Sequence, residues 1–219
     1  MCGRYSLTVS GERLAAEFGI EELASWLPKY NIAPTQQVPA LVDDDGKLAG
    51  VHLHWGLVPA WAKDRKIGSR LINARAETVA QKPSFRNALR KSRCLVLADG
   101  YYEWVKQSTG KQPIYIFPKD GRVFAFAGLH EQWRDENSAT YSSCTIITCA
   151  SNSDIEPLHH RMPVILPPEK YSIWLAAKAP IETLKEFLKP SPNGTLTTLA
   201  VSTFVNSPAH EGPDCIAAQ

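Results

Sequence analysis

Apolar and polar residues alternate in short runs along much of this chain. Residues 50–58 alternate with a period of two, which predicts a strand whose two faces differ in polarity. Turn residues at Gly110 and Asp120–Gly121 separate some of the later runs. Further strand-like runs are predicted at residues 93–102, 113–117, 123–129, 143–150 and 162–166. The pattern therefore predicts a sheet whose strands are joined largely by turns.

Helical patterns are short and lie mostly outside the strand-rich part of the chain. The segment Tyr30–Gln36 is predicted to be a loop stiffened by Pro34, and the chain after residue 188 is rich in loops. The predicted helices cover residues 11–18, 83–92, 168–176 and 180–188, with one helical turn at 154–159. Because strands do not alternate regularly with helices, we expect an α+β fold with an antiparallel, barrel-like core and peripheral helices.

Composition fits an ordinary globular domain. The chain has 219 residues, of which 44% are hydrophobic and 21% charged, so it is long enough to bury a core. With no internal repeat or linker, residues 1–219 are expected to form a single domain. No apolar run approaches the length of a membrane span, and no secretory leader is recognisable, so we expect no membrane partner.

The five cysteines form no C-x-x-C pair and are odd in number. This pattern argues against a disulfide framework and against a structural zinc site, so we expect neither a metal nor another cofactor. Cys94, Cys144 and Cys149 lie in apolar runs, where a cysteine usually packs as a small hydrophobic residue.

Positive charge is concentrated in one part of the chain. Residues 61–93 contain ten basic and two acidic residues, a net charge of +8 on a chain whose total is +2. A basic block of this kind is typical of a phosphate-binding face, although a solvated lysine- and arginine-rich surface would look the same.

Cys2 directly follows Met1. Methionine aminopeptidase generally removes Met1 before a small residue, which would leave an N-terminal cysteine. Its α-amine has an ordinary pKa near about 8 and its thiol one near about 8.5. With an aldehyde, the amine can form an imine onto which the thiol closes, giving a thiazolidine ring. The alternative is that Cys2 is simply the second residue of the chain.

Three internal clusters also carry candidate chemistry. In residues 71–78, Asn73 can donate and accept hydrogen bonds, and the Arg75 guanidinium can bind a phosphate through two hydrogen bonds. The alternative is that this segment is the start of a surface helix. In residues 98–104, Glu103 lies among aromatic residues that favour a raised pKa, or else ends a strand in solvent. In residues 159–163, two histidines precede Arg161 and provide a titratable base, or else form a polar turn.

These motifs occur in a specific order: Met-Cys-Gly-Arg, Trp55-Gly56-Leu57 with Trp61, Asn73-Ala-Arg-Ala-Glu-Thr, Gly100-Tyr-Tyr-Glu-Trp and His159-His-Arg-Met-Pro. In that order they resemble the SRAP (SOS response-associated peptidase) family, from Cys2 to about Ile216. The resemblance implies the SRAP fold and an enzyme that traps abasic sites in single-stranded DNA, or at junctions with duplex, as a thiazolidine crosslink. It assigns the catalytic roles to Cys2, Asn73, Glu103 and His159.

The resemblance also implies a DNA surface. It makes arginines the phosphate clamps and tryptophans the stacking platforms, and it matches a family loop that touches DNA. The implied contacts are Arg4, Asn31, Pro34, Trp61, Arg75, Trp104 and Arg161. The spacing between Trp61 and Asn73 is longer than in some family members, so residues 64–70 are an expected point of difference. A monomer is expected, in the cytoplasm of a bacterium or the nucleus of a eukaryote.

Three other functions stay open on the sequence. A cysteine autoprotease or peptidase would use Cys2 with Glu103 and His159, with Met1 as the only residue to release. Met-Cys-Gly also opens class II glutamine amidotransferases, in which the α-amine serves as the base for the thiol. A DNA-binding module with an inert Cys2 would bind DNA in a salt-sensitive way but form no covalent product.

Overall fold

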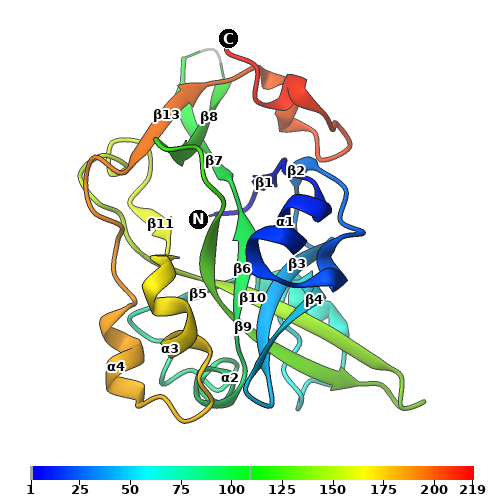
Figure 1. Ribbon diagram of the computed structural model, residues 1–219. Coiled ribbons are helices and arrows are strands. Elements are labelled where there is room, and N and C mark those ends of the chain that lie inside the picture. The colour runs from blue at the N-terminus through cyan, green and yellow to red at the C-terminus, as the bar shows by residue number, and fades with distance from the viewer. Residues whose placement is uncertain (1, 109) are drawn as a thin grey trace.

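A five-stranded barrel forms the centre of the molecule (Figure 1). The structure is a computed structural model, and it describes residues 2–108 and 110–219. Each barrel strand pairs with the next and β10 closes on β9. The five strands are β3 (Gln37–Asp44), β4 (Lys47–Trp55), β6 (Arg93–Ala98), β9 (Phe124–Arg134) and β10 (Thr140–Ala150). The expected barrel-like core of an α+β fold is thus confirmed.

Two pairings in this sheet are parallel, a detail that the expected antiparallel core did not include. β10 runs parallel to β4 and also to β5 (Asn73–Arg75). Parallel partners need a long connection, and the chain between β4 and β10 supplies one. β11 (Arg161–Pro163) pairs antiparallel with β10, and β12 (Ile165–Leu166) pairs with β9. The predicted strand at 162–166 is therefore two short strands that separate at Val164.

A second sheet packs beside the barrel and carries the N-terminal residues. Its order is β13 (Leu196–Ala200), β8 (Gly110–Pro118), β7 (Gly100–Gln107), β1 (Tyr5–Leu7) and β2 (Lys29–Ile32). The predicted loop Tyr30–Gln36 is wrong at its start, because Tyr30–Ile32 belong to β2 and only residues 33–36 form a turn.

The predicted strand 93–102 is broken in the structure, with β6 in the barrel and β7 in the second sheet. The break falls at Asp99, whose carboxylate accepts a hydrogen bond from Ser6 Oγ at 2.6 Å and one from Thr8 Oγ1 at 2.7 Å. A carboxylate anchored on the end of β1 turns the chain from one sheet into the other. This tertiary contact cannot be read from the local apolar pattern.

The helices lie at the periphery of the barrel (Figure 1), as expected. Ser10 caps the first α-helix by accepting a hydrogen bond from the Arg13 backbone N–H, and Gly19 ends it in the left-handed conformation. The α-helices are α1 (Gly11–Phe18), α2 (Arg86–Lys91), α3 (Tyr171–Leu175) and α4 (Ile181–Glu186), and the 3₁₀ helices are η1 (Glu21–Leu23), η2 (Arg65–Arg70), η3 (Pro168–Lys170), η4 (Thr203–Asn206) and η5 (Pro213–Cys215). No helix in the described part of the chain is long and apolar enough to span a membrane.

Arg93 is a structural residue, which corrects its place in the predicted basic face. Its side chain is 3% exposed and donates to the carbonyl oxygens of Leu89, Trp174 and Ala176. These carbonyls lie at the C-terminal ends of α2 and α3, where a buried guanidinium satisfies groups that the helices leave unpaired. The other basic residues of the block are exposed.

The core is continuous from the barrel to the second sheet, and Cys2 is part of it. Tyr5 on β1 packs edge-on against Trp55 and Phe126 from the barrel. The five cysteines are all free and buried, so the prediction that Cys94, Cys144 and Cys149 pack as apolar residues is confirmed. Cys2 and Tyr5 are thereby packed against the core of the barrel.

Candidate active site

Cys2 lies alongside β7. β1 pairs antiparallel with this strand through Tyr5 and Tyr101, and the ladder continues because the Tyr102 N–H donates to the Arg4 carbonyl oxygen at 3.0 Å. This register carries the chain before β1 along β7, so that Cys2 comes beside Glu103. The Cys2 side chain is fully buried.

Glu103 is a buried carboxyl in the body of β7, which excludes the alternative of a solvated strand end. It is 5% exposed, and burial raises its pKa while the nearby His159 acts in the opposite direction. Burial and the charge of Glu103 both raise the pKa of the Cys2 thiol, whereas a hydrogen bond with the Arg4 backbone lowers it. The two groups are thus electrostatically coupled, and the resting thiol is neutral near pH 7.

Tyr101 is a neighbour that the sequence patterns did not single out. Residues two apart in a strand point to the same face, so Tyr101 accompanies Glu103. Burial raises the pKa of its hydroxyl, as do the charges of Cys2 and Glu103. The hydroxyl has no hydrogen-bond partner among the described residues. Its place two residues before Glu103, within the predicted strand 93–102, was the signal that could have identified it.

Asn73 binds the backbone of Cys2 directly. It lies at the start of β5, where pairing with Ile146 of β10 fixes it, so the alternative of a surface helix start is wrong. Its Nδ2 donates to the Cys2 carbonyl oxygen at 2.7 Å. Its Oδ1 is buried and accepts no hydrogen bond from any residue that the structure describes. Such an acceptor is available to a polar hydrogen of a substrate or of a processed N-terminus.

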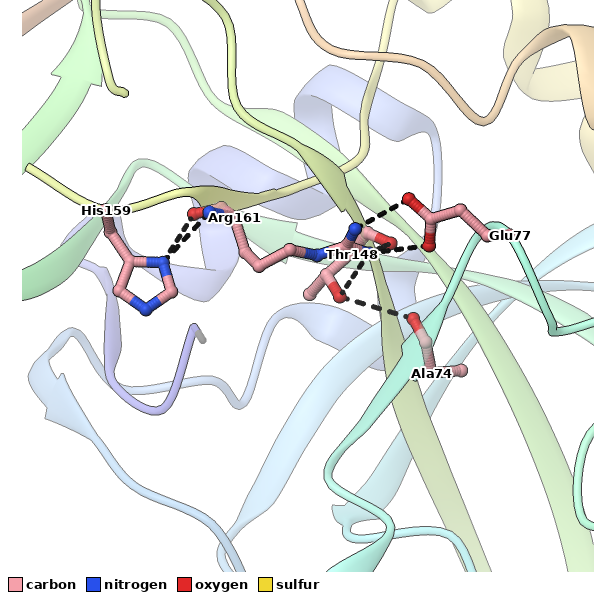
Figure 2. Close-up of polar contacts among 5 residues, drawn as sticks. All are labelled: Ala74, Glu77, Thr148, His159 and Arg161. Atoms are coloured by element: carbon pink, nitrogen blue, oxygen red, sulfur yellow. Dashed lines mark hydrogen bonds and ion pairs between the residues drawn. The ribbon is translucent and has the colours of Figure 1, made fainter. Parts of the chain in front are cut away.

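His159 follows a turn at residues 153–158, and its ring contacts the Arg161 backbone through Nδ1 (Figure 2). Its Nδ1 lies 3.0 Å from the Arg161 backbone nitrogen and 3.1 Å from the Arg161 carbonyl oxygen. The ring stacks on His160, with centroids 4.4 Å apart. Because Nδ1 is anchored, Nε2 is the nitrogen that can exchange a proton with a substrate.

Arg161 is held inside the protein. Figure 2 shows its guanidinium forked onto the Glu77 carboxylate, with Nη1 donating to Oε1 at 2.6 Å and Nη2 to Oε2 at 3.0 Å. Nη2 also donates to the carbonyl oxygen of Thr148. Only 11% of the Arg161 side chain is exposed. Glu77 and Thr148 had no assigned role in the sequence patterns, although Glu77 lies within one of the motifs.

The predicted DNA contacts Arg4, Asn31 and Trp104 gather at the C-terminal segment. Arg4 Nη1 donates to Asn31 Oδ1 at 2.6 Å, and the guanidinium lies 5.6 Å from the Trp104 ring centroid. Asn31 is 1% exposed, and its Nδ2 donates to backbone carbonyls, among them that of Ser207 at 2.9 Å. Trp104 Nε1 donates to Asn206 Oδ1. This group therefore ties β1, β2 and β7 to the end of the chain.

Trp61 and Arg75 lie on the outside of the molecule, and Pro34 is half-buried in the turn after β2. Trp61 is 58% exposed. The loop that contains Trp61 is held by Trp133, whose Nε1 donates a hydrogen bond to the Ala62 carbonyl oxygen at 2.7 Å. Arg75 is exposed one position beyond Ala74, whose side chain is buried.

The segment between Trp61 and Asn73 forms the 3₁₀ helix η2. It lies close to the end of β4, because a side chain at Gly68 would come within 2.6 Å of the Gly56 carbonyl oxygen. Trp61 and the exposed cations Lys63, Lys66 and Arg70 line a shallow hollow on this segment. Among the described residues, no cluster of three or more His, Cys, Asp or Glu side chains is placed to hold a metal ion.

The order of these motifs is that of a known family. A sequence profile described as SOS response associated peptidase (SRAP) matches residues 1–208. The chain belongs to the SRAP family. The resemblance inferred from the motifs is thereby confirmed.

Relatives and solved structures of the SRAP family extend the match along the chain. "Abasic site processing protein YoqW" of Bacillus subtilis is 39% identical over 221 residues, covering 99% of each chain. "Abasic site processing protein HMCES" of Gallus gallus is 31% identical over 99% of this chain and 77% of its own. A crystal structure of a Bacteroides thetaiotaomicron protein is 28% identical, with a TM-score of 0.90 over the whole of both chains.

Proposed function

We propose that this SRAP protein processes abasic sites in single-stranded DNA by forming a covalent thiazolidine crosslink through Cys2. The observation that carries the proposal is the placement of Cys2 between the Asn73 amide, at 2.7 Å from its carbonyl oxygen, and the coupled carboxyl of Glu103. The names of the relatives as abasic site processing proteins support the same substrate.

The nucleophile arises when Met1 is removed. In the unprocessed chain the Cys2 nitrogen is part of a peptide bond, and cleavage turns it into an α-amine. Because the buried thiol is neutral near pH 7, the amine attacks the aldehyde carbon C1′ first. Both nucleophilic atoms belong to one residue, so the second bond forms by proximity.

The bond changes balance with the loss of one water. The amine adds to C1′ and gives a carbinolamine, whose hydroxyl leaves as water after it accepts a proton. The resulting imine carbon then accepts the sulfur, and the thiol proton ends on the ring nitrogen. Glu103 is suited to carry these protons, because burial raises its pKa and makes its protonated form more accessible than that of an exposed glutamate.

Asn73 and His159 take the supporting roles. Asn73 Nδ2 fixes the Cys2 backbone, and Oδ1 is an acceptor for a hydrogen of the new amine or of the sugar. His159 donates a proton from Nε2 to the ring oxygen of the closed abasic sugar, which opens to the aldehyde. Tyr101, beside Cys2 and Glu103, offers a further hydroxyl to the reacting groups.

The DNA strand is proposed to follow the exposed residues next to this site. Arg75 and the cations of the Trp61–Arg70 segment meet phosphates, and Trp61 stacks on a base. Arg4 and Trp104 complete the surface at the C-terminal segment. Asn31 acts on this surface through Arg4, because its own side chain is buried.

Release of Met1 by the protein itself is a second candidate activity, favoured by the buried carboxyl of Glu103 next to Cys2. Intact-mass measurement of the purified protein and of Glu103→Gln tests it. Loss of Met1 from the first but not the second supports self-processing, whereas equal loss from both assigns it to an aminopeptidase. The amidotransferase alternative is tested separately, because such an enzyme would hydrolyse glutamine and the proposed crosslinking protein would not.

The crosslink is tested with a uracil-containing single strand treated with uracil glycosylase. Wild-type protein is expected to give a band that survives denaturation, and Cys2→Ala none. Cys149→Ala is the matched control, since Cys149 is also a buried free thiol. A full yield of adduct from Cys2→Ala would refute the proposal.

A further inference from the structure

The Arg161–Glu77 pair stands beside the site, and the proposed chemistry leaves Glu77 without a role. The two groups meet fork to fork through hydrogen bonds of 2.6 and 3.0 Å. This planar arrangement fixes the orientation of the guanidinium as well as its position. The charge-assisted hydrogen bond lowers the pKa of Glu77, so the carboxylate stays ionised in the pH range of the reaction.

The pair bridges two elements across β10 (Figure 2). Glu77 follows β5, which pairs with β10 up to Thr148, and Arg161 begins β11, which pairs with Ala150. Between them, the Thr148 carbonyl oxygen accepts hydrogen bonds from both Arg161 Nη2 and the Ala76 N–H. The segment that contains Asn73 is therefore linked by hydrogen bonds to Arg161, whose backbone contacts His159.

The Arg161 backbone can hold the His159 ring whether or not Nδ1 carries a proton. A neutral ring with a bare Nδ1 accepts from the Arg161 N–H at 3.0 Å. A ring protonated at Nδ1 donates to the Arg161 carbonyl oxygen at 3.1 Å. With Nδ1 held by either contact, the ring keeps its orientation while Nε2 exchanges a proton, provided that the Arg161 peptide groups stay in place.

We propose that Glu77 is a positioning residue of the active site, which holds Arg161 so that the Arg161 backbone keeps His159 oriented. As far as the reaction is concerned, this inference rests on the proposed function. It also distinguishes two uses of Arg161. As a phosphate clamp, Arg161 would bind DNA better without Glu77, because a competing carboxylate is removed. If Arg161 instead supports His159, removal of Glu77 would leave DNA binding unchanged but slow the crosslinking reaction.

The variant Glu77→Gln keeps the size of the side chain and removes its charge. Asp120→Asn is the matched control, because Asp120 also pairs with an arginine and is equally exposed, at 52% against 52%. The first measurement needs no DNA. Nitrogen-15 NMR of the imidazole rings gives the tautomer balance of His159, assigned with His159→Gln.

We expect the wild type and Asp120→Asn to give the same His159 tautomer balance, and Glu77→Gln to give a different one. The second measurement is the single-turnover rate of crosslinking at saturating abasic DNA. It is expected to fall roughly 10- to 100-fold in Glu77→Gln, as small misplacements of catalytic groups do. Glu77→Asp, which retains the charge, should recover part of the rate.

An unchanged His159 tautomer balance in Glu77→Gln overturns the inference, whatever the DNA assays show. A changed tautomer balance with an unchanged crosslinking rate at saturating DNA also overturns it, since positioning would then have no consequence for the reaction. Failure of the wild type to crosslink refutes the proposed function instead, and the NMR comparison still decides the structural part.

Discussion

The site joins two regions with opposite physical character. The interior region holds Cys2, Tyr101 and Glu103, which are buried and have raised pKa values. The outer region, Trp61–Arg70, is a short 3₁₀ segment with exposed cations and an exposed tryptophan. Both regions reach Asn73, because Cys2 hydrogen-bonds to it and Arg70 precedes it by three positions.

The difference shows how binding and chemistry are divided. Exposed charges interact weakly one by one and are screened by salt, so they suit a ligand with many phosphates. Buried groups feel each other strongly and can move protons near neutral pH. Substitutions in the interior region should therefore change rates, and substitutions in the outer region should change affinity.

The largest effect is expected in the interior region. Glu103→Gln removes the proton carrier while preserving the volume of the side chain, so the crosslinking rate should fall about 100- to 10,000-fold. Binding of undamaged single-stranded DNA should not weaken. Glu131→Gln is the control, since burial also raises the pKa of Glu131, which lies on β9. A Glu103→Gln rate within a factor of two or so of the wild type would remove Glu103 from the mechanism.

The next effect belongs to the outer region. Trp61→Ala should weaken single-stranded DNA binding by roughly 1–3 kcal/mol, which corresponds to about 5- to 150-fold in affinity. The crosslinking rate at saturating DNA should stay unchanged. Leu27→Ala provides the comparison, because Leu27 is 75% exposed and lies in another part of the chain. Equal affinities for the two variants would mean that Trp61 does not stack on DNA.

The pH dependence of the free energy of unfolding tests whether the carboxyl of the interior region is buried. The pKa of Glu103 is raised by burial, so the folded state binds this proton more tightly than the unfolded state. As pH rises from the ordinary pKa of a glutamate through the raised one, the wild type should therefore lose stability relative to Glu103→Gln. The loss should be about 1.4 kcal/mol for each pH unit that separates the folded and unfolded pKa values. Urea unfolding of both proteins between about pH 4 and 8 measures this. A constant difference would contradict the burial of an ionisable carboxyl.

The smallest effect concerns single charges of the outer region. Arg70→Gln should leave the crosslinking rate at saturation unchanged and reduce the slope of log affinity against log salt by at most about 0.7. Fluorescence anisotropy with a labelled undamaged strand over a salt series gives this slope. A large loss of crosslinking rate with an unchanged salt slope would mean that Arg70 takes part in the reaction and does not bind phosphate.

Sequence patterns predicted four of the five barrel strands and the presence of the peripheral helices because these elements follow local rules, but they missed β3. Burial on one face gives β4 its period of two, and Ser10 with Gly19 bounds α1. The break at Asp99 and the parallel pairing of β10 were missed, because both depend on contacts between distant segments. Arg93 was assigned to a surface for the same reason, since its acceptors lie at the ends of two helices.

The candidate site was predicted as residue types in motifs but not as geometry. Cys2, Asn73 and Glu103 could be named from the motifs, and the structure brings all three together. Glu77 and Tyr101 were not singled out, although each lies in a motif, because their roles depend on partners elsewhere in the chain. The same holds for Asn31, which looks like a surface residue in the sequence but is buried under the C-terminal segment.

The most direct test of the covalent chemistry is the mass of the adduct and of its N-terminal peptide. We predict a protein lacking Met1 joined to the abasic strand with the loss of one water, formed without a reducing agent. After digestion, the modification should lie on the peptide Cys2-Gly3-Arg4, with neither a free amine nor a free thiol on Cys2. An adduct that requires borohydride, retains Met1 or maps to a lysine would contradict this chemistry.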